Sequence, residues 1–278
     1  MVWRKCGSMI DKCEDIFSKI KKQDFYEVAK SIGELDSSVD VEYICKEYET
    51  GNGILLDTHE YWANRLKEGL GPDYSVYAKD YYLNEVFYCW KEYSRRYLLL
   101  MRKWLNEEDC PMKKSEIKSV LDLGCGLAFT TIGLKAIFED AKVYGTNEPD
   151  TVQIRFDRMI TESFDDVEIL NGNFGLDDKV DLIFASEFFE HLEEPIKFTR
   201  ELLEHYQPKY IVFANTFTKM SIGHFYHYKN DGVLVDRTEM PRLFTKTLKS
   251  YGYEKVPTSF FNNRPNIYKL VEKKGGLF

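Results

Sequence analysis

Short apolar runs alternate with longer amphipathic stretches over the second half of the chain, which is the pattern of a parallel sheet covered by helices. The runs that predict buried strands are 120–123, 141–146, 167–170, 180–185 and 210–214. The stretches that predict helices between them are about 128–138, 150–160, 196–205 and 241–251. Two further runs, 253–256 and 266–271, predict a closing hairpin. We therefore expect an α/β fold with a doubly wound sheet of seven strands.

Residues 1–112 differ from this pattern and predict an α-helical extension in front of an α/β domain at 113–278. Apolar residues recur at helical spacing over 10–20 and 25–32, and a further helix is expected over 41–48. From 74 to 105 the chain is rich in aromatic residues and predicts one or two more helices. The simpler interpretation is that these rings pack the extension onto the domain. The alternative is that some of the tyrosines line a substrate pocket.

Composition narrows the class of protein. The 278 residues carry a net charge of −8, which disfavours nucleic acid as a partner, because proteins bind its phosphates with a basic surface. A small-molecule substrate is favoured instead. Six cysteines are scattered without any C-x-x-C pair, which indicates reduced thiols rather than a disulfide framework or a zinc site. The first residues do not resemble a secretory signal, and there is no apolar run of about 18 residues. We expect a cytoplasmic protein without a membrane span.

The turn after the first predicted strand carries the main motif. Asp122 precedes Gly124-Cys125-Gly126, and a helix is expected from about residue 128. Glycines at such a turn let a ligand approach the backbone. The absence of Gly-x-Gly-x-x-Gly and of Gly-Lys-Ser/Thr argues against a dinucleotide site and a P-loop.

Leu121-Asp122-Leu123-Gly124-Cys125-Gly126 resembles the first motif of class I S-adenosylmethionine (SAM) dependent methyltransferases, and the resemblance extends from about residue 118 to the end. It implies a Rossmann-like methyltransferase sheet, SAM as cofactor and a methyltransferase activity of class EC 2.1.1. The positions it implies for cofactor binding are Asp122, Gly124, Cys125, Gly126, Asn147, Glu148, Asn173, Phe174 and Ser186.

Three of these positions depart from the family pattern or leave a choice open. Asn147 stands where the family has the acid that binds the ribose, and Glu148 follows it. We expect Glu148 to bind the ribose, with Asn147 as the alternative, although Glu148 could simply cap the next helix. Asn173 stands where an acid usually meets adenine, and Phe174 would flank the ring. Two amides in place of acids also allow a non-catalytic SAM-binding module.

The segment after the fourth strand contains Glu187-x-x-Glu190-His191. It is similar to the E-x-x-E-H of ubiquinone-biosynthesis O-methyltransferases and of small-RNA 3′-terminal 2′-O-methyltransferases. That similarity implies Glu187, Glu190 and His191 as ligands of a divalent metal such as Mg²⁺, Mn²⁺ or Zn²⁺. His191 as a metal-free base and His191 as a structural residue are the alternatives.

Candidate bases also lie in the long connection after the fifth strand. His224 and His227 lie in this connection of about 25 residues, which is longer than packing requires and is typical of a functional loop. An imidazole titrates near neutral pH and can therefore act as a base. The catalytic candidates are therefore His191, His224, His227 and Glu187. Arg264 lies in the turn of the last hairpin, which could border the pocket, although turn chemistry alone explains Asn and Pro there.

The expected reaction is methyl transfer to an oxygen of a small-molecule acceptor, with a base assisting. An RNA 2′-O-methyltransferase is a second hypothesis, which the glutamate–histidine motif permits and the charge disfavours. Asp/Asn-Pro-Pro-Tyr and Pro-Cys signatures are missing, which argues against methylation of DNA bases. The sequence does not identify the acceptor or the oligomeric state.

Overall fold

A computed structural model describes residues 22–50, 53–79, 82–148, 151–177, 179–260 and 264–271. The helix expected over 10–20 lies outside these residues. The elements of the N-terminal part are α2 (Lys22–Leu35), α3 (Val41–Thr50), α4 (Gly53–Lys67), η2 (Tyr74–Ala78), α5 (Tyr82–Cys89), η3 (Trp90–Ser94), α6 (Arg95–Trp104) and η4 (Lys114–Glu116). The elements that follow are β1 (Ser119–Leu123), α7 (Phe129–Ile137), β2 (Lys142–Asn147), α8 (Val152–Thr161), β3 (Val167–Asn171), β4 (Leu182–Ser186), η5 (Phe189–His191), α9 (Pro195–Tyr206), β5 (Tyr210–Ala214), β6 (His227–Asn230), β7 (Val233–Asp236), α10 (Met240–Ser250), β8 (Tyr253–Lys255) and β9 (Asn266–Leu270).

Seven strands form one sheet in the order β3-β2-β1-β4-β5-β9-β8. The strands β1 to β5 run parallel to one another, whereas β9 runs antiparallel to both β5 and β8. This arrangement confirms the predicted doubly wound sheet with its closing hairpin. The chain leaves β1 toward β2 on one side and reaches β4 on the other. The carboxyl ends of β1 and β4 therefore border the switch point where ligands bind in such sheets.

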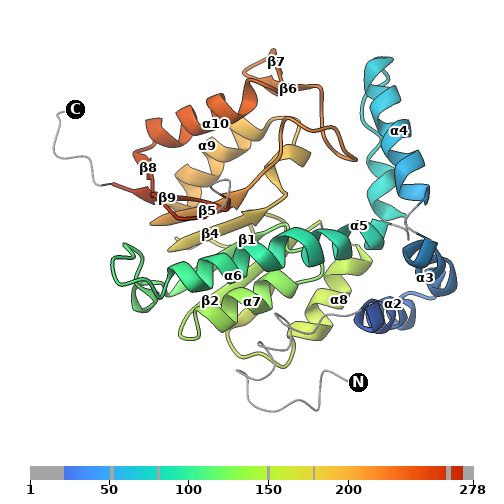
Figure 1. Ribbon diagram of the computed structural model, residues 1–278, viewed down its shortest axis with the longest axis horizontal. Coiled ribbons are helices and arrows are strands. Elements are labelled where there is room, and N and C mark those ends of the chain that lie inside the picture. Colours follow the sequence, from blue (N-terminus) through green and yellow to red (C-terminus); the bar gives the residue numbers. More distant parts are fainter. Residues whose placement is uncertain are drawn as a thin grey trace.

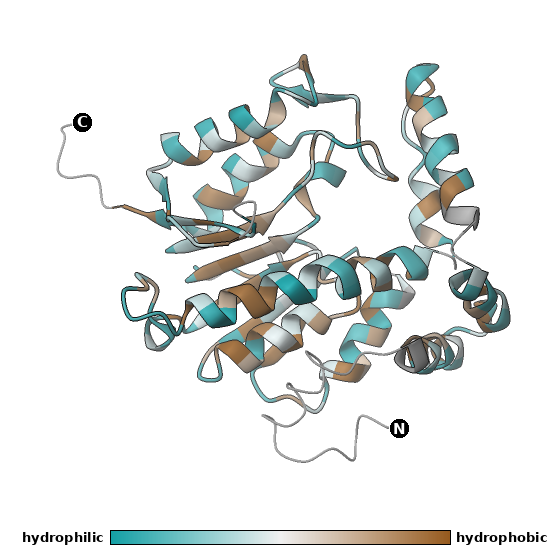
Figure 2. Ribbon diagram, viewed as in Figure 1, coloured by the Kyte–Doolittle hydropathy of each residue, from teal (hydrophilic) through white to brown (hydrophobic). Residues whose placement is uncertain are grey.

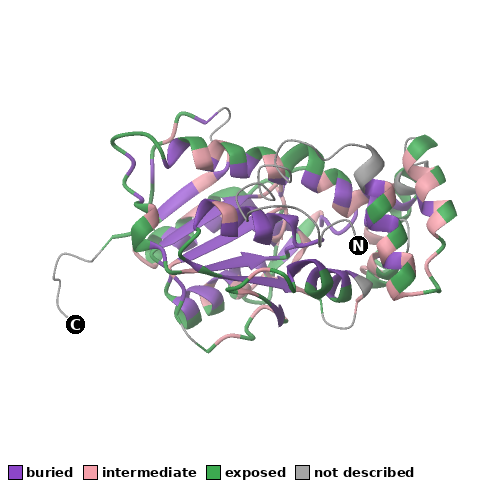
Figure 3. Ribbon diagram, turned by 90° about the horizontal axis from the view of Figure 1, so that it is seen from below, coloured by how far each residue is buried: buried purple, intermediate pink, exposed green. Residues whose placement is uncertain are grey.

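Helices cover both faces of the sheet (Figure 1): α9 and α10 lie on one face, and α6, α7 and α8 on the other. The strands alternate between the two cores. In β1, Val120 belongs to the cluster under α6 and α7, and Leu121 to the cluster under α9 and α10. Figure 2 shows the brown, hydrophobic residues concentrated on the strands and inner helix faces. Figure 3 shows the same strands buried.

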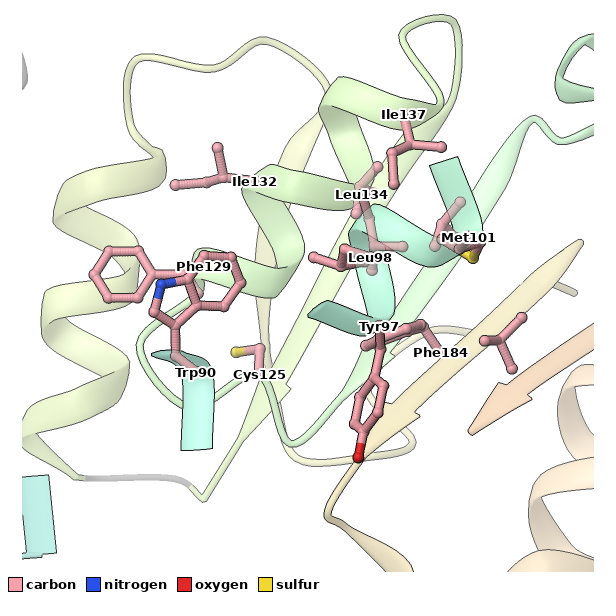
Figure 4. Packing of buried hydrophobic residues seen from close by; sticks show 14 of the residues in the cluster. Trp90, Tyr97, Leu98, Met101, Cys125, Phe129, Ile132, Leu134, Ile137 and Phe184 are labelled. Atoms are coloured by element: carbon pink, nitrogen blue, oxygen red, sulfur yellow. The ribbon is translucent and has the colours of Figure 1, made fainter. Parts of the chain in front are cut away.

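The helix α6 belongs to the layer of helices on one face of the sheet, although it precedes β1 in sequence. Its residues Leu98 and Met101 pack with Leu134 of α7 and Phe184 of β4 in one buried cluster (Figure 4). Trp90 of the aromatic stretch also packs on Phe129 of α7, with 5.5 Å between ring centroids, so part of the stretch joins the extension to the domain. Tyr74 and Tyr77 line a cavity instead, in line with the alternative interpretation. The boundary at 112/113 stays a prediction.

The rest of the extension lies beside the sheet, and its helices pack on one another. Phe25 of α2 stacks on Tyr48 of α3 at 4.1 Å between ring centroids, and it meets Phe87 of α5 edge-on. The helix α4 was not predicted. Its Trp62 is buried against Tyr77 and Phe225, so α4 covers the connection after β5.

That connection contains a small hairpin, β6–β7, which sequence analysis took for irregular loop. The turn between the strands is Asp231-Gly232, both at positive φ. Asp-Gly between extended residues is a standard hairpin signal. The described residues contain no helix that is both long and apolar enough to cross a bilayer.

Candidate active site

A cavity of about 1190 Å³ lies at the carboxyl ends of β1, β2 and β4, between the sheet and the extension. It is larger than the roughly 300–1,000 Å³ of typical ligand pockets, which gives space for a cofactor and an acceptor together. The cofactor-binding residues predicted from sequence that line it are Asp122, Gly124, Cys125, Gly126, Asn147, Glu148, Asn173 and Ser186.

The glycine turn after β1 forms the floor of this cavity. Gly124 and Gly126 both have positive φ, at +66° and +64°. A Cβ at Gly124 would lie 2.6 Å from the ring of Phe188, and one at Gly126 would lie 2.9 Å from Val86. Only glycine fits at these two positions, so the bare backbone is presented to the cavity. Phe188 is a wall residue that sequence analysis missed.

Asp122 brings a buried carboxyl group to the same end of the cavity. Its Oδ2 accepts hydrogen bonds from the hydroxyls of Thr130 at 2.5 Å and Thr131 at 2.7 Å. Burial raises the pKa of Asp122 to about 6, while the two hydroxyls act in the opposite direction. An ammonium group in the cavity would therefore meet a carboxylate at neutral pH.

The end of β2 presents Asn147 and Glu148 to the cavity in different ways. The amide nitrogen of Asn147 donates to the carbonyl oxygen of Gly126 at 2.8 Å, and its carbonyl oxygen accepts from the N–H of Glu148 at 3.1 Å. The Asn147 side chain is thus bonded within the protein. Glu148 is exposed and lines the cavity.

The two residues predicted to contact adenine separate in the structure. Asn173 lines the cavity, and its carbonyl oxygen accepts from the hydroxyl of Thr146 at 2.9 Å. Phe174 does not line the cavity, which corrects the expectation for it. Its ring stacks on Tyr206 of α9 and lies against Phe198, so α9 draws it away.

Strand β4 ends in Ser186 and Glu187, which face the extension across the cavity. The hydroxyls of Ser186 and Ser94 are 2.8 Å apart. Ser94 is the last residue of η3, a π-helical turn of the kind that often occurs at functional sites. Glu187 has a φ of +51°, which is strained for a residue other than glycine.

Glu187 and Glu190 form a pair of buried carboxyl groups. Glu190 is completely buried and accepts from the backbone N–H of Thr216. Burial raises the pKa of both groups, and the charge of Glu187 raises that of Glu190 further. Arg264 lies nearby and lowers the pKa of Glu187, while its guanidinium donates to Thr216 Oγ1 at 2.9 Å. Arg264 lines the cavity, so the turn of the last hairpin borders the pocket, which is one of the two interpretations of that turn.

His191 lies between the extension and the loop after β5. Its Nδ1 is 3.2 Å from the hydroxyl of Tyr77 in η2. The backbone of Gly223 crosses this contact so closely that a Cβ there would lie 2.0 Å from the Tyr77 hydroxyl and 2.2 Å from His191 Nδ1. Burial lowers the pKa of His191 to about 3, and a charge on His224 would lower it further.

His224 is buried and lines the cavity beside His191, with 4.9 Å between the ring centroids. Its Nδ1 is 2.9 Å from the carbonyl oxygen of Lys219. A carbonyl only accepts, so Nδ1 carries the proton and Nε2 of the neutral ring keeps its lone pair. Burial lowers the pKa of His224 to about 4, although hydrogen bonds to the backbone of Lys219 and Thr216 act to raise it.

The third predicted base does not reach the site. His227 is exposed on β6, 3.9 Å from Asp236 on the paired strand, and it does not line the cavity. This placement corrects the expectation that His227 could act as a base, because the hairpin turns its side chain outward. His59 of α4, which the sequence analysis did not single out, lines the cavity, and its Nε2 is 3.1 Å from the Ser221 hydroxyl.

Side chains of the extension bind two loops of the domain. The loops are 189–193 after β4 and 219–224 after β5. The contacts are Tyr77 with His191, Tyr74 with Glu193 at 2.6 Å, Trp62 with the carbonyl oxygen of His224 at 2.7 Å, and His59 with Ser221.

The structure does not support the predicted metal site. Within the described ranges, no three or more His, Cys, Asp and Glu side chains are placed to hold a metal ion. His191 faces Tyr77 and His224, whereas Glu190 faces the Thr216 amide. The three expected ligands therefore do not converge.

Comparison with known proteins agrees with this geometry. Residues 121–213 match the family model described as a methyltransferase domain. No curated protein sequence matches the chain significantly. The structure of PigF with SAH matches 82% of this chain and 72% of its own, with a TM-score of 0.52 and 10% identity, and it supports the fold.

Two other solved structures match with lower TM-scores. A putative caffeoyl-CoA O-methyltransferase from Staphylococcus aureus has 14% identity over 76% of this chain and 96% of its own, with a TM-score of 0.44. A SAM-dependent methyltransferase from Aquifex aeolicus has 18% identity over 67% and 95%, with a TM-score of 0.43. The family match, the sheet order and the glycine turn together show that the chain carries a class I SAM-dependent methyltransferase domain.

Proposed function

We propose that this methyltransferase transfers the methyl group of SAM to an oxygen of a small-molecule acceptor, with His224 as the base. The observation that carries the proposal is the contact of His224 Nδ1 with the Lys219 carbonyl. This contact fixes the tautomer in which Nε2 can accept a proton. The low pKa of about 4 keeps the ring neutral over the whole neutral range.

The cofactor end of the cavity is assigned to the residues around the glycine turn. Gly124 and Gly126 give the backbone surface, and the Asp122 carboxylate pairs with the ammonium group of the methionine moiety. Glu148 is proposed to accept from the ribose hydroxyls, because its carboxylate is exposed to the cavity. The bond from Thr146 occupies the Asn173 carbonyl oxygen, so the Asn173 amide nitrogen is the atom proposed to meet adenine.

When bound, SAM supplies a methyl group activated by its sulfonium sulfur, and the reaction leaves S-adenosylhomocysteine (SAH). The cavity walls hold the acceptor oxygen in line with that methyl group, which accounts for most of the rate in such a transfer. The proton of the acceptor hydroxyl passes to Nε2 of His224. His191 packs against the His224 ring and fixes its plane.

Two features favour a small acceptor. The cavity is closed on one side by the extension, through the contacts of Tyr77 and Trp62 with the loops after β4 and β5. Its wall includes the aromatic residues Tyr74, Tyr77, Tyr82, Tyr88 and Tyr93, which suit an apolar or aromatic hydroxyl compound.

The test combines SAH titration with a labelled methyl donor. SAH should bind the purified chain and bind more weakly to Glu148→Ala. Trideuteromethyl-SAM, incubated with enzyme and a metabolite extract, should label small molecules, which mass spectrometry detects. His224→Gln should abolish the label and keep SAH affinity, whereas His205→Gln, at an exposed residue, should change neither.

Three results would overturn the proposal. They are label in nucleosides of digested RNA instead of small molecules, undiminished label with His224→Gln, and absence of SAH binding to the wild-type chain. Equal SAH affinity of Glu148→Ala and the wild type would overturn the ribose assignment alone.

A further inference from the structure

The amide of Asn147 makes more than one bond within the protein. Besides the Gly126 carbonyl oxygen at 2.8 Å, its Nδ2 donates to Oδ2 of Asp157 at 3.1 Å. Its Oδ1 accepts from the N–H of Glu148. Both protons of the amide nitrogen therefore point at acceptors, one in the glycine turn and one in α8.

Asp157 lies behind this contact and is completely buried. Its Oδ2 also faces the thiol of Cys125 at 3.6 Å, and its Oδ1 has no hydrogen-bond partner among the described residues. Burying a carboxyl group beside an amide and a thiol, without a paired cation, is costly. The hydrogen bonds from Asn147 and Cys125 and the charge of Arg158 offset only part of this cost, because the pKa of Asp157 stays raised.

We propose that Asp157 and Asn147 act as a clamp on the glycine turn: Asp157 orients the Asn147 amide, and the amide holds the Gly126 carbonyl in the conformation that binds SAM. Asp157 is a positioning residue, since it does not line the cavity. The proposal rests on the cofactor site of the proposed function and is independent of the acceptor.

The clamp explains why an amide stands where the family resemblance implies an acid. A carboxylate at position 147 would place one of its oxygens against both the Gly126 carbonyl and the Asp157 carboxyl group, at the distances of 2.8 and 3.1 Å that Nδ2 now has. Acceptors would then face acceptors. Only the protonated acid could donate to one of them. Ribose binding consequently falls to the next residue, Glu148.

The titratable and charged groups around the clamp come from three elements. They are Asp122 on β1, Cys125 in the glycine turn and Arg158 on α8. Burial, together with the charge of Asp122, raises the pKa of Asp157. In Asn147→Asp, the new carboxyl group would lie among the same buried and charged groups. As the pH falls it should become protonated and again donate one hydrogen bond within the clamp.

The experiment is SAH titration calorimetry at pH 6 and pH 8 on the full chain. Asn147→Asp should weaken SAH binding about tenfold or more at pH 8, and the ratio to wild type should recover at pH 6. Asp157→Leu should weaken binding at both pH values. Asp157→Asn should stay close to wild type, because its carbonyl oxygen can still accept from Asn147.

A matched control is Asn171→Asp at the end of the neighbouring strand β3. The Asn171 carbonyl oxygen faces Arg158 at 2.6 Å, so a carboxylate is tolerated there and SAH affinity should not change. Thermal melting without SAH separates loss of fold from loss of affinity.

The clamp is overturned if Asn147→Asp binds SAH like wild type at pH 8, or with the same deficit at both pH values. It is also overturned if Asp157→Leu melts lower but binds SAH with unchanged affinity, because Asp157 would then act on stability alone. Absence of SAH binding to the wild-type chain would overturn the cofactor proposal itself, and the clamp with it.

Discussion

The hydroxyl of Tyr77 and Nδ1 of His191 lie 3.2 Å apart, and the backbone of Gly223 runs directly across them. Three segments thus meet at one contact: the extension, the turn after β4 and the loop after β5. The absence of a side chain at Gly223 is what allows this meeting.

Gly223→Ala should destabilise the protein by more than 2 kcal/mol, because a Cβ there overlaps both side chains and the φ of +81° is unfavourable for alanine. Urea denaturation measures the change. Gly232→Ala is the matched control, since Gly232 has a φ of +80° and nothing within 4 Å of an added Cβ. Equal losses in the two variants would show that the overlap contributes nothing.

The two neutral histidines predict a loss of stability in acid. The pKa of His224 is about 4 in the folded protein and about 6.5 in the unfolded chain, so the unfolded state takes up the additional proton. The contribution of neutral His224 to the free energy of unfolding is complete above pH 6.5, and it falls by up to about 2 kcal/mol by pH 5. His191 acts in the same direction.

His224→Gln should therefore reduce the difference in unfolding free energy between pH 7.5 and pH 5, measured by urea denaturation. An unchanged difference with His224→Gln would mean that His224 is not kept neutral by its surroundings.

The strained backbone at Glu187 predicts a trade of stability against activity. Glu187→Gly should stabilise the fold by about 0.5–1 kcal/mol, because glycine adopts the φ of +51° without strain. Methyl transfer should fall, since the carboxyl group that lines the cavity is lost. Gln207→Gly, at φ +47° after α9, should give a similar gain in urea denaturation with full activity. A destabilised Glu187→Gly would contradict the strain.

The pKa of Asp122 predicts how SAH affinity depends on pH. Affinity should decrease below about pH 6, where the carboxyl group becomes protonated and no longer attracts an ammonium group. Thr131→Val removes one of the two hydroxyl donors, so it should raise this pKa and move the decrease to higher pH.

Titration calorimetry between pH 5.5 and 8 tests the shift. Thr161→Val is the control, because the Thr161 hydroxyl is also buried but bonds only to backbone carbonyls of its own helix α8. Identical pH profiles for Thr131→Val and wild type would exclude Asp122 as the group that titrates.

The strands and most helices of the sheet were predictable, because buried parallel strands are continuous apolar runs and their helices keep one apolar face. The hairpin β6–β7 was missed although Asn230-Asp231-Gly232 carries a hairpin signal. As a result, His227 was grouped with His224. His224 lies in the loop before β6 and lines the cavity, whereas His227 begins β6 and is exposed, so closeness in sequence does not bring both to the site.

The glycine turn and the strand ends were predictable as cavity residues, because their place after a strand fixes them. Phe174 was not, since its direction depends on Tyr206 in α9. Asp157 and His59 were also beyond sequence reasoning. Each acts through a partner far away in the chain, and no local pattern distinguishes a buried acid in a helix from a solvated one.

The way in which the extension binds the domain also bears on how such an enzyme can evolve. Its hydrogen bonds go to the loops that carry His191 and His224, and its tyrosines form part of the cavity wall. A change of the extension that admits a new acceptor therefore also moves the imidazoles. Acceptor selectivity and the rate of methyl transfer should therefore change together. Replacing the extension by that of a relative should transfer both properties or abolish both.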